Sequence, residues 1–151
     1  NWRQQQHFFE YQLNLANQLQ LPVIVHHRRS HQQIIEVLKK VPVKRGGVIH
    51  AFSGSYQQGK TYIDMGFKLG IGGSLTYDRA KKLRRIATDM PLSTLVLETD
   101  SPDIPLLNHR GKPNQPKRVR EVAEVLAGLR GISLEELAHA TSTTARKLLN
   151  L

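Results

Sequence analysis

Apolar and polar positions follow two different periods along this chain. Short β-branched or apolar runs, bounded by turn residues, predict strands at residues 23–25, 48–49, 67–71 and 95–99. Apolar residues recur every three or four positions in the longer stretches between them, which is the period of an amphipathic helix. In the first such stretch, residues 3–20, the apolar positions are Phe8, Phe9, Leu13, Ala16 and Leu19.

Capping and breaking residues set the ends of the other predicted helices. Ser30 with Gln33, and Ser133 with Glu136, have the spacing of a capping box, in which two side chains bond the first turn reciprocally. Asp78 is a suitable N-cap residue for a helix that Pro91 would end. The predicted helices therefore run from Ser30 to Val41, over 56–65, from Asp78 to Met90 and from Pro116 to Leu129, and a terminal pair of short helices follows Ser133, with Leu148, Leu149 and Leu151 docking back.

Strands and helices alternate without any hairpin signal. This order is typical of βα units and predicts an α/β fold with a parallel sheet, as one domain over residues 1–151. Four such units amount to about half of a TIM-like (β/α)₈ barrel. A small open, doubly wound sheet is the alternative. No glycine-rich nucleotide fingerprint follows any strand, which argues against the common nucleotide-binding versions.

The composition shows a strongly basic chain and excludes disulfide bonds and membrane-spanning helices. Lys and Arg total 22 against 12 Asp and Glu, for a net charge of +10. Such a balance favours polyanionic partners, although a basic surface that only aids solubility would give the same count. The absence of cysteine excludes disulfides and thiolate metal sites, and a cytoplasmic location is the default expectation. No apolar run approaches the length of a membrane span, so no membrane partner is expected.

Polar groups capable of chemistry stand at three of the four strand ends. The first strand ends at His26, the second at His50 and the fourth at Asp100. His50 follows His26 by 24 residues, and Asp100 follows His50 by 50, so the three groups recur at matching points of successive βα units. Because active sites of parallel α/β folds lie beyond the carboxyl ends of the strands, we expect the three side chains to converge.

Two imidazoles and one carboxylate form a partial ligand set for a divalent metal. Imidazole nitrogen favours Zn or Mn over Mg, and a metal held there can lower the pKa of a bound water. Asp100 could bind the metal and also take the proton of that water. The alternative is structural: a histidine can simply end a strand, and Asp100 before Ser101 and Pro102 could bond its own turn.

The two-residue period of a strand adds further candidates. Arg28 has the parity of His26, and Glu98 has the parity of Asp100, so these side chains would point the same way. Arg28 could hold a substrate phosphate bidentately, or it could form a buried ion pair with Glu98. Four other histidines lack this alignment and are expected on the surface or in loops: His27, His31, His109 and His139.

Three ordered segments resemble the signature sequences of one known family. LPVIVHHRRS at 21–30, VIHAFSG at 48–54 and LVLETDSPDIP at 95–105 are similar to those of the TatD metal-dependent hydrolases, which are regarded as deoxyribonucleases. GFKLGIGGSLTY at 66–77 and GKPNQP at 111–116 agree as well, with Gln115 where the family has glutamate. The resemblance covers essentially the whole chain.

The resemblance implies both a fold and a reaction. The fold is a TIM-like (β/α)₈ barrel with a divalent metal ion (Zn, Mn or Mg, and two in the full-length family). His26 and His50 map onto metal ligands, and Asp100 maps onto the aspartate that binds metal and activates water for hydrolysis of DNA phosphodiester bonds. The family's His-x-His pair and its further glutamate ligand have no counterpart in this chain, so it resembles the C-terminal part of the barrel, with the N-terminal strands absent.

Two other functions are compatible with the sequence. A basic α/β domain could bind nucleic acid without catalysis, in a salt-sensitive and metal-independent way. A related amidohydrolase could act on amides or carboxylic esters, because fold does not fix substrate. Whatever its function, a half-barrel would leave the outer strands at residues 22–26 and 94–99 without a partner on one side. Exposed strand edges of this kind favour self-association.

Overall fold

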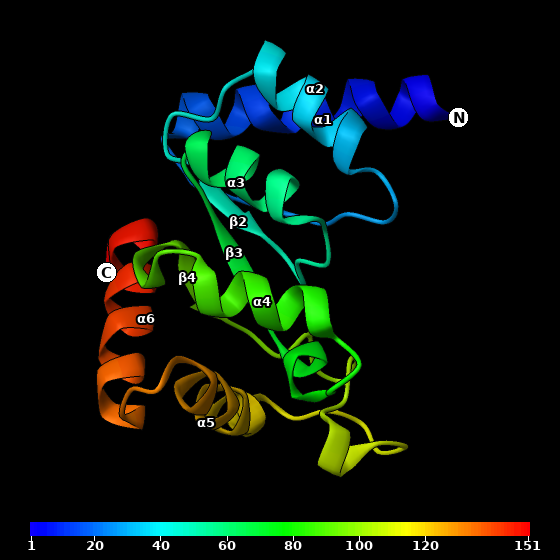
Figure 1. Ribbon diagram of the computed structural model, residues 1–151. Coiled ribbons are helices and arrows are strands. Elements are labelled where there is room, and N and C mark those ends of the chain that lie inside the picture. Colours follow the sequence, from blue (N-terminus) through cyan, green and yellow to red (C-terminus); the bar gives the residue numbers. More distant parts are fainter.

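The computed structural model describes all 151 residues as a four-stranded parallel sheet with helices packed against it (Figure 1). The strands are β1 (Val23–Val25), β2 (Gly47–Ile49), β3 (Phe67–Ile71) and β4 (Leu95–Leu97), and they lie in the order β1-β2-β3-β4. A doubly wound sheet would reverse direction at an internal switch point. The strictly sequential order is instead that of consecutive units of a barrel, which confirms the predicted α/β class.

Six α-helices connect and flank the strands. They are α1 (Trp2–Leu19), α2 (His31–Lys40), α3 (Tyr56–Asp64), α4 (Lys81–Asp89), α5 (Val119–Arg130) and α6 (Leu134–Leu149). Short 3₁₀ turns stand at Gly73–Thr76, Leu92–Thr94, Leu107–His109 and Pro116–Arg118. Helices α1 and α2 lie at the β1 side of the sheet, whereas α5 and α6 lie at the β4 side (Figure 1). None of the helices has the length and apolar character needed to cross a bilayer.

One face of the sheet is buried against the helices, and the other is open over β1. Ile49, Leu69 and Ile71 are fully buried within a cluster of 25 apolar residues. The alternate residue Ile24 is 74% exposed, although it lies in the middle of β1. Because side chains of a strand alternate between faces, Ile24 marks the face that a closed barrel would turn inward.

The predicted helix ends are only partly right. Ser133 caps α6 by accepting a hydrogen bond from the Glu136 backbone N–H (3.0 Å). Ser30 precedes α2, but its hydroxyl accepts from the Arg28 N–H (3.3 Å) and makes no cap bond. The complete capping box is formed by Ser55 and Gln58, at the start of α3.

The start of α4 and the end of the chain also differ from expectation. Asp78 pairs with Arg84, and the helix begins only at Lys81, so Asp78 is not its cap. The terminal pair of short helices is wrong, since residues 134–149 form the single helix α6. That stretch contains no glycine or proline to break it. Leu149 and Leu151 do not dock back, because they are 50% and 86% exposed.

Two of these four histidines take part in an aromatic cluster: His27 lies in the loop before α2, as predicted, whereas His31 is the first residue of α2 and not a surface or loop residue. The rings of His27 and His31 are 4.1 Å apart between centroids, and both histidines are half-buried. His31 Nδ1 lies 3.0 Å from the hydroxyl of the fully buried Tyr62. Burial, assisted by the nearby His27, lowers the pKa of His31 to about 4.

The other two histidines lie as predicted in a loop and on the surface. His109 belongs to the loop after β4 and is half-buried beside Glu121, with His109 Nε2 2.8 Å from Oε1. His139 is exposed on α6.

The lowered pKa of His31 predicts a loss of stability in mild acid. Between the ordinary histidine pKa near 6.5 and the folded value of about 4, the unfolded chain binds a proton that the folded chain does not. The free energy of unfolding should therefore fall as pH falls through this window. In His31→Phe the fall should be shallower, as measured by urea unfolding at several pH values. Equal slopes in the two proteins would contradict this account.

Candidate metal centre

The parallel register brings His26, His50 and Asp100 to one edge of the sheet. Val25 of β1 is paired with Ile49 of β2, so the residues that follow them, His26 and His50, stand side by side. The His50 N–H continues the ladder by donating to the Val25 carbonyl (2.9 Å). The prediction that His26 and His50 lie at the same level of successive βα units agrees with this geometry.

His50 lies between two carboxylates. Its Nδ1 is 2.9 Å from Glu98 Oε2, and its Nε2 is 3.1 Å from Asp100 Oδ1. The side chains of His50 and Glu98 are only 18% and 17% exposed, whereas that of Asp100 is 37% exposed. Donation from Nδ1–H to Glu98 leaves the Nε2 atom directed at Asp100 and the open side of the site.

Glu98 is held in place on both of its oxygens. Oε2 meets His50, and Oε1 accepts a hydrogen bond from the Ala51 backbone N–H (2.9 Å). Burial raises the pKa of Glu98, and the hydrogen bond from His50 opposes that rise. The suggested ion pair between Arg28 and Glu98 is therefore wrong: Arg28 is exposed and forms no salt bridge, while Glu98 bonds to His50 and Ala51.

Space for this carboxylate comes from a glycine on the neighbouring strand. A Cβ added at Gly70 of β3 would stand 2.2 Å from Glu98 Oε2 and 3.2 Å from the Ile49 carbonyl oxygen. Any larger residue at position 70 would thus displace Glu98 from His50. β3 supplies no candidate ligand of its own, but its Gly70 leaves room for Glu98, and Glu98 orients the ring of His50.

The loop that carries Asp100 is fixed by a residue far along the chain. Asp100 has a left-handed backbone conformation (φ 55°), which aspartate tolerates better than most residues. The buried Asn114 donates from its amide to the carbonyls of Thr99 (2.8 Å) and Ile104 (3.1 Å). Its backbone N–H donates to the Pro102 carbonyl (2.8 Å). Asn114 therefore braces the turn on which Asp100 stands.

His26 is the most loosely held of the three candidates. It is exposed, makes no hydrogen bond through its ring, and its centroid lies 6.0 Å from that of His50. Nowhere in the structure do three or more His, Asp or Glu side chains gather closely enough to share a metal ion. The structure thus brings the three candidates together at one edge, and a metal site that uses all of them remains a prediction.

The donor chemistry of this edge fits a divalent cation. His50 Nε2 and Asp100 Oδ1 face each other at 3.1 Å, and the His26 nitrogens are free nearby. His50 also has the carboxylate partner on its other nitrogen that metal-binding histidines usually have. Sequence reasoning gave Glu98 the correct direction through strand parity, but it did not identify this partnership, nor the role of Asn114.

Comparison with known proteins agrees with this geometry. The family model of TatD related DNases matches residues 1–150. The chain belongs to the TatD family. A protein of Haemophilus influenzae named an uncharacterized metal-dependent hydrolase is 48% identical over 93% of this chain and 53% of its own length. The 3'-5' ssDNA/RNA exonuclease TatD of Erwinia tasmaniensis is 34% identical over 98% of this chain and 60% of its own length.

A solved structure of a TatD homologue supports the fold of this chain directly. The crystal structure of YjjV, a TatD homologue from Escherichia coli, superposes with a TM-score of 0.95 at 42% identity, over 99% of this chain and 57% of that one. The partial-barrel fold is thereby confirmed. The chain spans a little more than half the length of the relatives it matches.

The position of Glu98 should depend on the absence of a side chain at residue 70. We expect Gly70→Ala to destabilise the fold by about 1–3 kcal/mol, the usual cost of overpacking, and to separate Glu98 from His50. Gly128→Ala is the matched control, because a Cβ at this position, in the last turn of α5, meets nothing within 4 Å; it should stabilise by about 0.4–1 kcal/mol. Denaturant unfolding measures both, and a neutral Gly70→Ala would refute the packing argument.

Proposed function

We propose that this chain carries the active-site edge of a metal-dependent hydrolase that cleaves phosphodiester bonds in DNA. The observation that carries the proposal is the placement of His50 between Glu98 and Asp100 at the carboxyl ends of parallel strands. Family membership and the relatives named as metal-dependent hydrolases and as an exonuclease support it. A divalent ion (Zn, Mn or Mg) is the proposed cofactor.

The proposed roles follow from the contacts. His26, His50 and Asp100 would hold the cation, which when bound lowers the pKa of a coordinated water. Glu98 fixes the ring orientation of His50 by accepting from Nδ1–H. Asp100 presents Oδ1 to His50, while Oδ2 has no hydrogen-bond partner in the fold. That second oxygen can accept the proton of the attacking water, as general-base catalysis requires.

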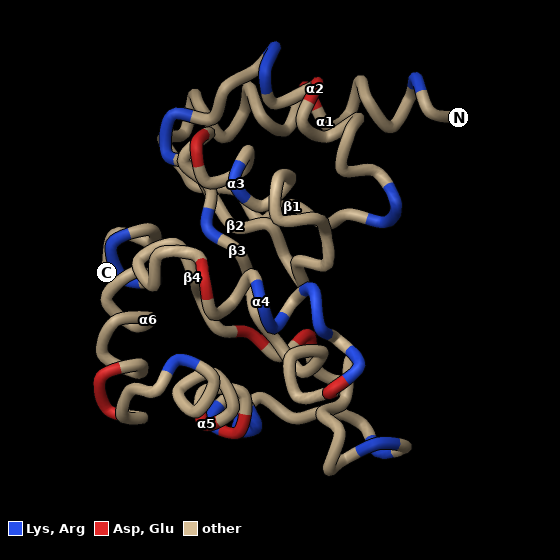
Figure 2. The backbone as a smooth tube through the Cα atoms, viewed as in Figure 1, with Lys and Arg blue, Asp and Glu red and all other residues tan.

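Arg28 is the proposed substrate-binding residue. It follows His26 by two residues, is exposed and forms no salt bridge, so its guanidinium is available to a ligand. A planar guanidinium can hold a phosphate through two parallel hydrogen bonds. The net charge of +10, spread over the fold as Figure 2 shows, would attract a polyanionic strand from a distance without selecting its sequence.

A direct test is to replace the proposed base, Asp100, with asparagine, which has nearly the same shape but cannot act as a base. We expect Asp100→Asn to reduce Mn²⁺- or Zn²⁺-dependent cleavage of labelled single-stranded DNA about 10²-fold or more, the usual contribution of a general base. Asp103→Asn is the control, since Asp103 is an exposed carboxylate in the same loop. Cleavage that survives chelation, or that survives Asp100→Asn unchanged, would defeat the proposal. Salt-sensitive binding without cleavage in wild type would favour the non-catalytic alternative.

The open edges of the sheet lead to a second, structural proposal. β1 pairs only with β2, and β4 pairs only with β3, while Ile24 is 74% exposed on the open face. The outer side of α1 adds Phe8 and Tyr11, which are 62% and 63% exposed. Edge strands and apolar surface of this kind favour pairing with another chain, and we propose self-association through them.

Size measurement in solution tests this proposal. Light scattering of the purified chain should give a mass above that of one 17.1 kDa copy. Ile24→Lys places a charge on the open face and should lower the measured mass, whereas Lys40→Gln on the outer face of α2 should not. A wild-type chain that is monodisperse and monomeric at high concentration would contradict self-association.

A further inference from the structure

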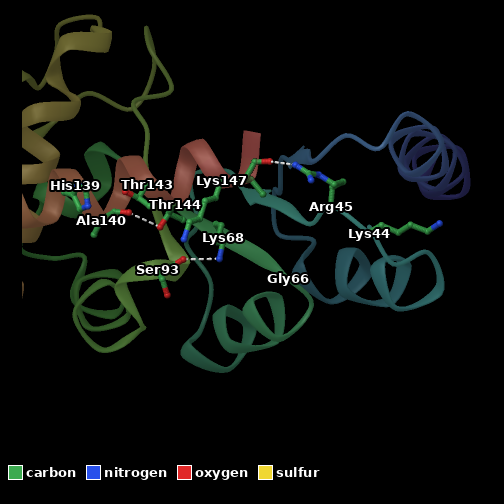
Figure 3. Close-up of a pocket in the computed structure, with 11 residues that line it drawn as sticks. Lys44, Arg45, Gly66, Lys68, Ser93, His139, Ala140, Thr143, Thr144 and Lys147 are labelled. Atoms are coloured by element: carbon green, nitrogen blue, oxygen red, sulfur yellow. Dashed lines mark hydrogen bonds between the residues drawn. The ribbon is translucent and has the colours of Figure 1, made fainter. Parts of the chain in front are cut away.

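A second polar cavity lies at the opposite end of the sheet from the candidate metal centre. It has a volume of about 590 Å³, it is open to solvent, and it is lined by the segments that lead into β2, β3 and β4 together with α6 from His139 to Leu148. Lys44 and Arg45 precede β2, Gly66 precedes β3 and Ser93 precedes β4. The cavity is therefore built at the amino ends of the strands (Figure 3).

Every ionised group that lines this cavity is basic. Lys44, Arg45, Lys68 and Lys147 contribute four cations, and no Asp or Glu is among the 11 lining residues. None of the four forms a salt bridge anywhere in the fold, although other surface cations such as Lys60 and Arg120 do. Cations that share one concave site without an acidic partner repel one another, and an anion bound there would relieve that repulsion.

Two of the cations are held in position by the backbone. Lys68 Nζ donates to the Ser93 carbonyl (3.0 Å), and an Arg45 Nη2–H donates to the Leu148 carbonyl (3.3 Å). These bonds tie β3 to the segment before β4, and the segment before β2 to the end of α6. Each leaves further N–H groups free, since ammonium has three and guanidinium five. In Figure 3 Lys68 and Lys147 reach into the same space, whereas Lys44 points away from it.

The neutral lining also suits an oxyanion. The Thr144 hydroxyl donates to the Ala140 carbonyl (3.0 Å), but the Thr143 hydroxyl has no partner in the fold and is free to donate to a ligand. A guanidinium fork, compact ammonium groups and a hydroxyl together are donors typical of phosphate sites. The volume lies within the range of about 300–1,000 Å³ of small-molecule sites.

We propose that this cavity, formed by Arg45, Lys68, Thr143 and Lys147, is a binding site for a phosphate-bearing anion. The site is separate from the metal centre, because it lies at the other ends of the same strands. Two sources share this chemistry: a small free phosphate or pyrophosphate, and the backbone phosphates of a nucleic-acid strand. The proposal does not rest on the proposed catalytic function.

The first arm of the test uses pyrophosphate and isothermal titration calorimetry. The wild-type chain should bind pyrophosphate saturably, and binding should weaken as salt is raised. The double variant Lys68→Met, Lys147→Met should bind about tenfold or more weakly, as expected for the loss of charged contacts. The double variant Lys40→Gln, Lys82→Gln removes the same charge from exposed positions on α2 and α4, and it should stay within about twofold of wild type.

The second arm separates the two sources of phosphate. A fluorescent oligothymidylate without terminal phosphates is titrated with the same three proteins in the presence of chelator. If Lys68→Met, Lys147→Met binds pyrophosphate more weakly but binds the oligonucleotide as wild type does, the ligand is a free anion. If the variant binds both probes more weakly, the ligand is the phosphate backbone of a strand. Either result supports the proposal.

Other outcomes would overturn it. Absence of saturable pyrophosphate binding to wild type, or equal weakening in the two double variants, would show that Arg45, Lys68 and Lys147 act only as general surface charge. Circular dichroism and thermal unfolding of each variant confirm that it is folded. If Lys68→Met, Lys147→Met does not fold, the milder Lys147→Met, Thr143→Val variant tests the same site, because neither side chain holds another element in place.

Discussion

The buried hydrogen bond between His50 and Glu98 organises the candidate metal centre. A carboxylate that is 17% exposed loses hydration, and it remains in place only because the His50 ring and the Ala51 N–H replace that hydration. This contact joins the end of β2 to the end of β4 across β3, whose Gly70 gives it room. The orientation of the His50 ring, and therefore the direction of its second nitrogen toward Asp100, follows from that contact.

Much of the fold could be predicted from the sequence, because local patterns specify it. The strand at Phe67–Ile71 was predicted with its observed bounds, since alternation and flanking glycines agree there. Helix starts were less predictable, because Ser30 and Asp78 have competing local partners, Arg28 and Arg84. The exposure of Phe8 and Leu19 on α1 could not be read from periodicity, since both sides of this helix are apolar.

The candidate site was predictable to a similar extent. His26, His50 and Asp100 follow strands, and parallel strands end together, so their shared position follows from topology. Glu98, His27 and His31 depend on tertiary contacts instead. Strand parity gave Glu98 the same direction as Asp100 but suggested Arg28 as its partner, whereas the structure pairs it with His50. The ring contact of His27 with His31 depends on the loop conformation that precedes α2.

The two ends of the sheet differ in their electrostatics. At the carboxyl ends, Glu98 and Asp100 place negative charge beside the imidazoles, whereas Arg45, Lys68 and Lys147 leave the amino ends positive. A cation and an anion are thus attracted to opposite ends of the same four strands.

Asn114 has a consequence for how this protein can change in evolution. The turn bearing Asp100 depends on two carbonyl contacts from one amide that is 15 residues from Thr99 and outside the sheet. A substitution at position 114 would leave β4 and the apolar core intact while releasing the carboxylate from its orientation. If the proposed function holds, such a substitution would disturb the site without removing any residue of the apolar core, so screens for misfolding would not detect it.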